Sequence, residues 1–151
     1  MATEQEHIEL ANRNHDAIRA LLDAQGDHPE WVATIAFYKA LQIVEATFAW
    51  KGLGHGHGHS RRLEILQDAK NGYSSLCKHY EALMEASEVA RYLGARSSAG
   101  AGYARFSDYM SMAAVRDKLL KKRLMNVEVH ARRFLSDDSK KILKNYDSLF
   151  S

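Results

Sequence analysis

The sequence predicts an all-α protein, and two observations support this class. Ala and Leu together number 37, whereas Val, Ile and Thr number 15; the first pair suits helices and the second group suits pleated sheets. Apolar residues recur every three or four positions over most of the chain, which is the period of an amphipathic helix. The chain has 151 residues, with one Pro and one Cys. Its length predicts one domain covering residues 1–151.

Two helices are expected in the first third of the chain. The residues from 3 to 25 keep helical spacing and end at Gly26, a residue that commonly terminates helices. Pro29 then begins a second helix, because a first helical turn accepts its missing N–H. Apolar side chains cover nearly the whole circumference of residues 31–50, which places this helix at the centre of the bundle. We expect both tryptophans of this helix to pack inside, and its one polar stripe consists of Lys39, Gln42 and Glu45.

Glycine-rich segments divide the middle of the chain. Residues 52–59 contain four Gly in eight positions, which predicts a loop because each Gly in a helix is costly. A short helix follows over residues 60–69, and a longer helical pattern runs over residues 73–93. Residues 94–104 are small and Gly-rich, and they predict a second irregular connection within the same domain.

The last third predicts one long and one short helix. The long helix runs from Phe106 to Leu135. Ser136 and the two Asp after it offer a cap and an acidic first turn for the short helix, which ends near Phe150. The side chains of the long helix that should face inward are Met110, Ala113, Leu120, Leu124, Val127, Ala131 and Phe134.

Composition indicates the compartment. Cys77 is the only cysteine, so an internal disulfide is excluded and a reducing environment fits. The first nine residues carry three acids and no apolar run, and polar residues interrupt the most apolar segment. We therefore expect a cytoplasmic protein with no signal peptide, no membrane span and no cofactor.

Several residues of the first two thirds form a pattern that resembles small HEPN-domain proteins. A Trp-led helix with a Tyr-x-Ala signature passes through an apolar segment and a glycine-rich loop to a His near the next helix. The following helix of residues 73–93 is also similar. The matching residues are His28, Pro29, Glu30, Trp31, Tyr38, Lys39, Ala40, Leu41, Glu45, Ala46, His59, Arg62, Tyr73, Leu76, Tyr80, Leu83, Arg91 and Tyr92.

The resemblance implies a fold and a class of activity. It implies an up-and-down antiparallel bundle of four to five helices that pairs into a homodimer. Many HEPN proteins are metal-independent ribonucleases of toxin–antitoxin or antiviral defence systems, and a nucleotidyltransferase is a possible antitoxin partner. Other members are non-catalytic modules that bind a protein partner. The resemblance therefore leaves open whether this chain cleaves RNA, binds it, or binds protein.

The catalytic members of this family carry an Arg, a short spacer and a His. Here Arg123 and His130 fit that spacing with six residues between them, and seven steps of an α-helix align them about 10 Å apart. The resemblance implies catalytic roles for Arg123 and His130, and Asn126 lies between them on the aligned face, where it would orient the phosphate. Arg116 and Arg133 extend the same line, so we expect them and Lys122 to hold RNA. A His suits proton transfer near neutral pH. The alternative is a solvated basic helix face with an incidental histidine.

The charges of the chain are unevenly distributed. Residues 1–90 hold 8 Lys+Arg and 13 Asp+Glu, a net charge of −5, whereas residues 91–151 hold 13 and 6, a net charge of +7. A basic half attracts an RNA backbone or an acidic protein. Opposite halves could equally attract each other across a homodimer, which supports the alternative of a non-catalytic interaction module.

A histidine-rich loop is a candidate metal site. His55, His57 and His59 alternate with Gly, so an extended backbone places all three imidazoles on one side, where they can bind a divalent cation. The alternative is an unliganded loop, because ordering several Gly is costly in entropy and no acid or Cys lies near in the sequence.

Overall fold

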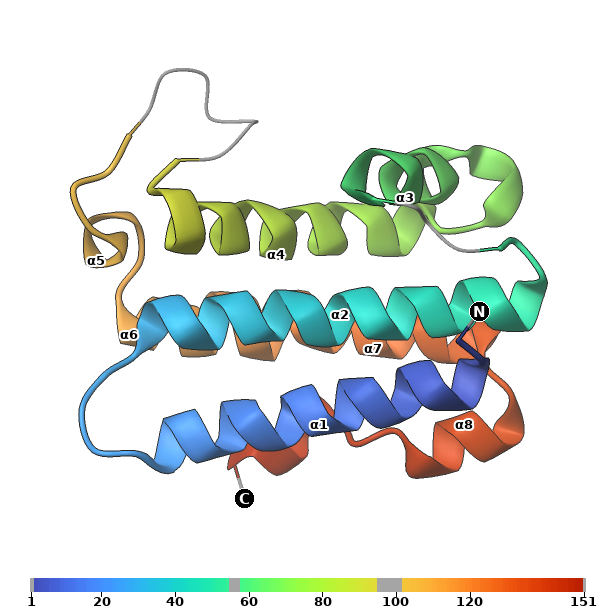
Figure 1. Ribbon diagram of the computed structural model, residues 1–151, viewed down its shortest axis with the longest axis horizontal. Coiled ribbons are helices and arrows are strands. Elements are labelled where there is room, and N and C mark those ends of the chain that lie inside the picture. Colours follow the sequence, from blue (N-terminus) through green and yellow to red (C-terminus); the bar gives the residue numbers. More distant parts are fainter. Residues whose placement is uncertain (1, 55–57, 95–101, 151) are drawn as a thin grey trace.

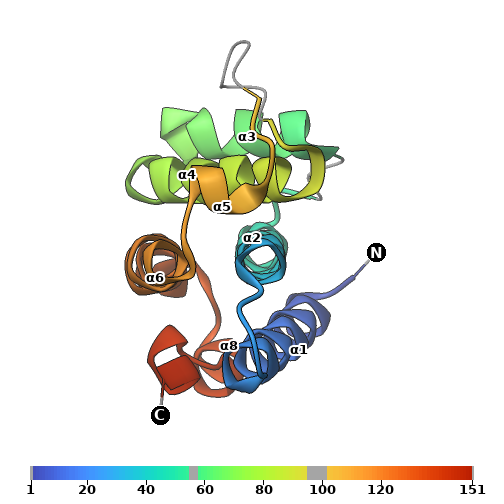
Figure 2. The same ribbon diagram turned by 90° about the vertical axis from the view of Figure 1, so that its left-hand side faces the viewer.

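The computed structural model describes residues 2–54, 58–94 and 102–150. These residues form helices and connections with no strand among them, which confirms the all-α class. Figure 1 shows that the long helical segments alternate in direction along the chain, as in an up-and-down bundle. Seen along its length in Figure 2, the bundle has α3 and α4 on one side, α2 beside α6 in the middle, and α1 with α8 on the other side.

The first helical hairpin follows the sequence pattern. Helix α1 (Glu4–Asp23) begins at a capping box, in which the Thr3 side chain accepts from the Glu6 amide and the Glu6 carboxylate accepts from the Thr3 amide. Helix α2 (Pro29–Lys51) has Pro in its first turn and ends at Gly52, whose φ of 70° is left-handed. Both helices agree with the sequence prediction, and α2 lies between α1 and α4 in the bundle.

The tryptophans at the two ends of α2 correct one expectation. Trp31 is 58% exposed and Trp50 is 55% exposed, so neither packs inside. The apolar surface of α2 between them is largely buried by the neighbouring helices. Of the described helices, α2 alone is long and apolar enough to cross a membrane, by length and composition only, and most of it is buried inside the bundle.

The middle of the chain forms α3 (Gly58–Gln67), the short 3-10 turn η1 (Ala69–Asn71) and α4 (Ser74–Tyr92). Each helix agrees with its predicted range to within two residues. The helix α4 ends at Leu93, whose φ of 57° is left-handed and whose amide donates to the Val89 carbonyl. The left-handed residue thus ends the helix without the Gly that usually occupies such a position.

The prediction of one long helix from Phe106 to Leu135 is wrong for its first residues. The chain forms a single turn, α5 (Phe106–Tyr109), and is then extended at Met110. The side chain of Ser111 accepts from the Ala114 amide and so caps a new helix. Of the residues expected to face inward, Ala113 is exposed, and Met110 and Phe134 are only partly buried.

The new helix is one rod of mixed geometry. It consists of α6 (Met112–Ala114), the π-helix η2 (Val115–Leu124), α7 (Met125–Ala131) and the 3-10 turn η3 (Arg132–Phe134). A π-helix has more residues per turn than an α-helix and is rare outside short bulges, many of which lie at functional sites. The rod packs against α2 and α4 through Val115, Leu119, Leu120, Leu124, Val127 and Ala131, which are all buried.

The C-terminal segment also differs from its prediction. Ser136 caps α8 (Asp137–Ile142) as expected, but the helix ends there and a separate 3-10 turn, η4 (Tyr146–Phe150), follows. The segment from 143 to 150 lies against α1 and the rod, with Leu143 and Leu149 buried in the common core. Side chains of α2 and α7 hold its backbone through hydrogen bonds to the Lys144 carbonyl and the Tyr146 amide.

Candidate functional site

Arg123 and His130 meet a third residue on the face between α4 and the rod. Nη1 of Arg123 lies 3.2 Å from Nδ1 of His79, which belongs to α4. The rings of His79 and His130 are nearly parallel, at 14°, with their centroids 6.4 Å apart. His79 is buried, whereas Arg123 and His130 are partly exposed. The two predicted site residues are therefore brought together through His79 and remain open to solvent.

The contact with Arg123 determines which ring nitrogen of His79 carries the proton. Burial, followed by the charge of Arg123, lowers the pKa of His79 to about 4, so the ring is neutral at physiological pH. A guanidinium can only donate hydrogen bonds, so Nδ1 of His79 accepts and its proton is on Nε2. His79 thus positions the guanidinium and is not itself an acid at neutral pH.

The other predicted RNA contacts lie along the same rod. Asn126 donates through Nδ2 to the Lys122 carbonyl at 2.7 Å, so the side chain is folded back onto the helix. Lys122, Arg116 and Arg133 are exposed. The residues between Arg116 and Arg123 are π-helical, which removes the α-helical alignment expected for that pair. These exposed cations therefore lie on the same rod as Arg123 and His130 but not along one straight line.

The predicted metal site cannot be described as a unit. His55 and His57 lie outside the described residues. His59 is in the first turn of α3, where its ring packs 5.6 Å from that of Phe37 and its Nδ1 lies 3.4 Å from Nη1 of Arg62. Within the ranges that the structure describes, no three His, Cys, Asp or Glu side chains are grouped so as to hold a metal.

A second polar cluster is buried below His59. Nε of Arg62 donates to Oε1 of Glu45 at 2.8 Å, and both side chains are almost fully buried. Burial raises the pKa of the neighbouring Tyr80 to about 12, an effect that the Arg62 charge partly offsets. These residues are among those that carry the resemblance to HEPN proteins, and they join α2, α3 and α4. The ion pair explains why Glu45 can lie on a central helix.

A third polar cluster joins α1, α2, α7 and the C-terminal segment. Nζ of Lys39 is fully buried and donates to Glu128 Oε2 at 2.8 Å, His15 Nδ1 at 2.9 Å and the Lys144 carbonyl at 3.0 Å. An ammonium has three donors, so all three are satisfied. The Tyr146 amide donates to Glu128 Oε1, and the second ring nitrogen of His15 lies 2.8 Å from Ser148 Oγ.

The pairing of Ser148 with His15 resembles a nucleophile and its base, but the protons exclude that role. Because Lys39 donates to Nδ1 of His15, the proton of the neutral ring is on Nε2 and points at Ser148. A general base would need a free lone pair there. Cys77 is equally unsuited as a nucleophile, because burial and Glu81 raise its pKa to about 12. The Lys39 cluster is structural.

The state of His15 predicts how stability depends on pH. Burial, then the Lys39 charge, lowers the pKa of His15 from 6.5 to about 4. Between these values the unfolded chain binds a proton that the folded chain does not, so stability falls as pH falls from 6.5 to 4. Protonation of His15 lowers the free energy of unfolding by at most about 3 kcal/mol, reached below pH 4, since one pKa unit corresponds to about 1.4 kcal/mol. Urea unfolding of the wild type and His15→Gln across this range checks it: equal slopes against pH would contradict the assignment.

Two parts of these clusters were not predicted from the sequence. His79 lies three residues after Leu76 and four before Leu83, which places it on the apolar side of α4, and this spacing was the available signal. Lys39 belongs to the recognised polar stripe of α2, but its partner Glu128 is 89 residues away in the chain.

Comparisons with protein-family models, curated proteins and solved structures give no match for this chain.

Proposed function

We propose that the chain binds RNA on the exposed face of the rod and cleaves it at Arg123 and His130. The observation that carries the proposal is the group of Arg123, His79 and His130, which joins a fixed cation and an accessible imidazole on one face. Four further cations, Lys78, Arg116, Lys122 and Arg133, lie on the elements that form this face, α4 and the rod. The resemblance to HEPN proteins supports the same function.

The proposed chemistry is transfer within the RNA strand. The 2′-oxygen of a ribose attacks the adjacent phosphorus and loses its proton to a base, while the bond from phosphorus to the 5′-oxygen breaks and that oxygen receives a proton. The products are a 2′,3′-cyclic phosphate and a 5′-hydroxyl. Arg123 stabilises the charge that develops on the phosphate oxygens, and His130 transfers a proton. His79 keeps the guanidinium in place.

The second proton-transfer group would come from a partner copy. A homodimer that places two His130 side chains across one phosphate would supply an acid and a base. The alternative function, a non-catalytic homodimeric module that binds a protein partner, would use the same surface.

RNA binding is the first test of this proposal. We expect a fluorescent single-stranded RNA of mixed sequence to bind the wild type. The logarithm of its binding constant should fall linearly with the logarithm of the salt concentration. Lys122→Gln, which removes one exposed phosphate contact, should weaken binding several-fold and make the salt slope shallower by about one. Arg61→Gln changes an exposed cation on α3 and serves as the matched control. Equal affinities for both variants and the wild type would overturn the proposed RNA face.

A further inference from the structure

Phe150, in the C-terminal 3-10 turn η4, is an aromatic side chain at the surface beside the rod. It is 38% exposed, although its neighbour Leu149 is buried in the core. The turn packs against α1 and the rod, and Nη1 of Arg19 donates to the Ser148 carbonyl at 3.0 Å. Phe150 therefore presents part of its ring to solvent from a turn that is held in place.

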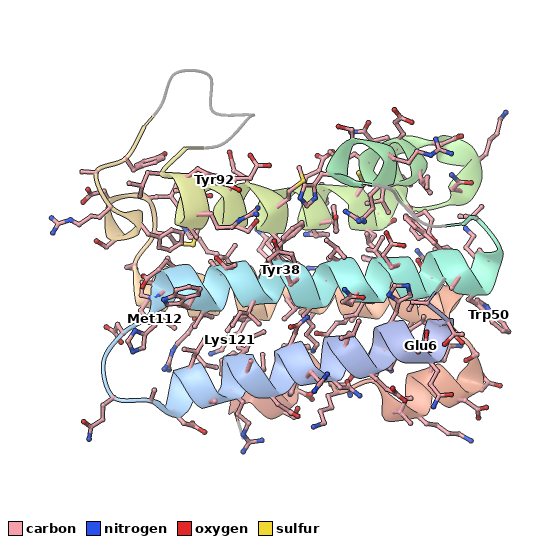
Figure 3. All side chains as sticks on the ribbon, in the orientation of Figure 1. Glu6, Tyr38, Trp50, Tyr92, Met112 and Lys121 are labelled. Atoms are coloured by element: carbon pink, nitrogen blue, oxygen red, sulfur yellow. The ribbon has the colours of Figure 1, made fainter. Side chains whose placement is uncertain are left out.

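The ring of Phe150 lies next to a cation of the rod. Nζ of Lys121 is 4.9 Å from the centre of this ring. The Lys121 side chain is 52% exposed and its ion pair with Asp117 is long, at 3.9 Å, so the side chain is weakly held. In Figure 3, Lys121 lies toward α1, on the opposite side of α2 from α4. The aromatic ring and the cation therefore meet at the edge of the rod that faces away from α4.

Three consecutive cations connect this pair with the group at Arg123. Lys121 contacts the C-terminal turn, whereas Nη1 of Arg123 lies 3.2 Å from His79 of α4. Lys122, between the two cations in the sequence, is exposed. The three side chains therefore pass around the solvent side of the rod, which lies between α4 and the C-terminal segment in Figure 2. A phosphate backbone attracted by these cations would cross the rod instead of running along it.

We propose that Phe150 is a base-stacking residue of the RNA face, which therefore takes single-stranded RNA. An unpaired base stacks on the ring, and Lys121 moves from the ring to an adjacent phosphate. Stacking of a base on an aromatic ring is stronger than the contact of an exposed cation with such a ring, so this exchange is favourable. Bases inside a duplex are paired and stacked on each other, so they cannot reach the ring. This role of Phe150 rests on the proposed RNA binding by the rod and adds the class of RNA that binds there.

Binding of an uncleavable oligonucleotide measures the contribution of the ring. A labelled single-stranded RNA with 2′-O-methyl groups keeps its bases and phosphates but has no 2′-hydroxyl for attack. Phe150→Leu, which stays apolar but loses the aromatic face, should weaken binding of this strand about fivefold or more, whereas Phe150→Trp should retain it. The matched control is Ile142→Ala, which changes a 44% exposed apolar side chain on α8 and should bind like the wild type. A duplex of the same length should bind the wild type more weakly and lose nothing in Phe150→Leu.

Removing single bases from the RNA tests the same contact without changing the protein. Among oligonucleotides that each lack one base, at least one should bind the wild type about fivefold or more weakly, with no further loss in Phe150→Leu, because both changes remove one interaction. Equal binding of the single strand by wild type and Phe150→Leu, or additive losses at every position, would overturn the role of Phe150 and leave the RNA face in place. Preference for the duplex would do the same. A wild type that binds neither form would overturn the RNA face as well.

Discussion

Replacing Lys39 by methionine should reduce the free energy of unfolding by about 3–5 kcal/mol, the usual cost of removing one partner of a buried ion pair. The variant leaves the carboxylate of Glu128 buried without its ammonium and leaves Nδ1 of His15 and the Lys144 carbonyl without a donor. An unpaired buried polar group carries its full desolvation cost. Urea unfolding at pH 7 measures the loss, which is a large part of the stability of a typical domain.

A second variant separates loss of charge pairing from loss of packing. In Lys39→Met with Glu128→Gln, the unpaired charge is gone, and we expect recovery of at least half of the lost stability. Arg61→Met removes an exposed ion pair with Glu64 and should change stability by less than about 1 kcal/mol. If Lys39→Met lost as little as Arg61→Met, the buried cluster would not be holding the C-terminal segment to the bundle.

The helical hairpin of α1 and α2 could be predicted because its determinants are local. The cap at Thr3, the first-turn Pro29 and the left-handed Gly52 are each read from a few neighbouring residues. The apolar side chains around nearly the whole circumference of α2 likewise predict its central place in the bundle. Local patterns of this kind define where the helices begin and end, and the bundle follows from burying their apolar faces.

The rod and the C-terminal segment could not be predicted as well, because their features depend on distant contacts. The new helix begins at Ser111 because Met110 before it is extended, and nothing in the spacing distinguishes π from α geometry over residues 115–124. The C-terminal segment ends its helix at Ile142, where Asn12 accepts from the Lys144 amide and donates to the Ile142 carbonyl. These partners lie more than a hundred positions apart in the sequence.

The candidate site was predicted only in part, because some of its contacts also depend on residues that are distant in the sequence. The spacing of Arg123 and His130 was visible, and both are on one face as expected. The residue that joins them, His79, belongs to another helix, so only tertiary packing reveals the contact. The polar stripe of α2 was visible too, but its partners Arg62 and Glu128 come from α3 and α7. Sequence patterns identified the polar residues of the rod and of α2, and only the packing of the helices shows which residues they contact.

Replacing His130 by alanine should lower the rate of RNA cleavage by about 10²–10⁴-fold, the range for loss of a general acid or base. The substitution removes a partly exposed side chain whose ring stacks along that of His79, so the fold should persist. Arg123→Lys should also reduce the rate, because an ammonium cannot reproduce the contact of the planar fork with a phosphate. Cleavage of a labelled single-stranded RNA, resolved on a gel, measures both.

Two controls distinguish this activity from that of contaminating nucleases and from loss of the fold. Arg61→Ala, purified in the same way, should retain full activity, and the circular dichroism of His130→Ala should match that of the wild type. Equal cleavage by wild type and His130→Ala would mean that the activity belongs to another protein or another site. RNA binding without cleavage would leave the rod as a binding surface and remove the enzymatic part of the proposal.

The most direct test of the RNA-processing face is the fate of one oligonucleotide in EDTA with and without its 2′-hydroxyl groups. Attack by the 2′-oxygen requires that group, so the ribose strand should be cut to fragments ending in a 2′,3′-cyclic phosphate, while the DNA strand of the same sequence stays intact. Mass spectrometry of the fragments identifies this end group. An uncut ribose strand, or equal cutting of both strands, would contradict the roles given to Arg123 and His130.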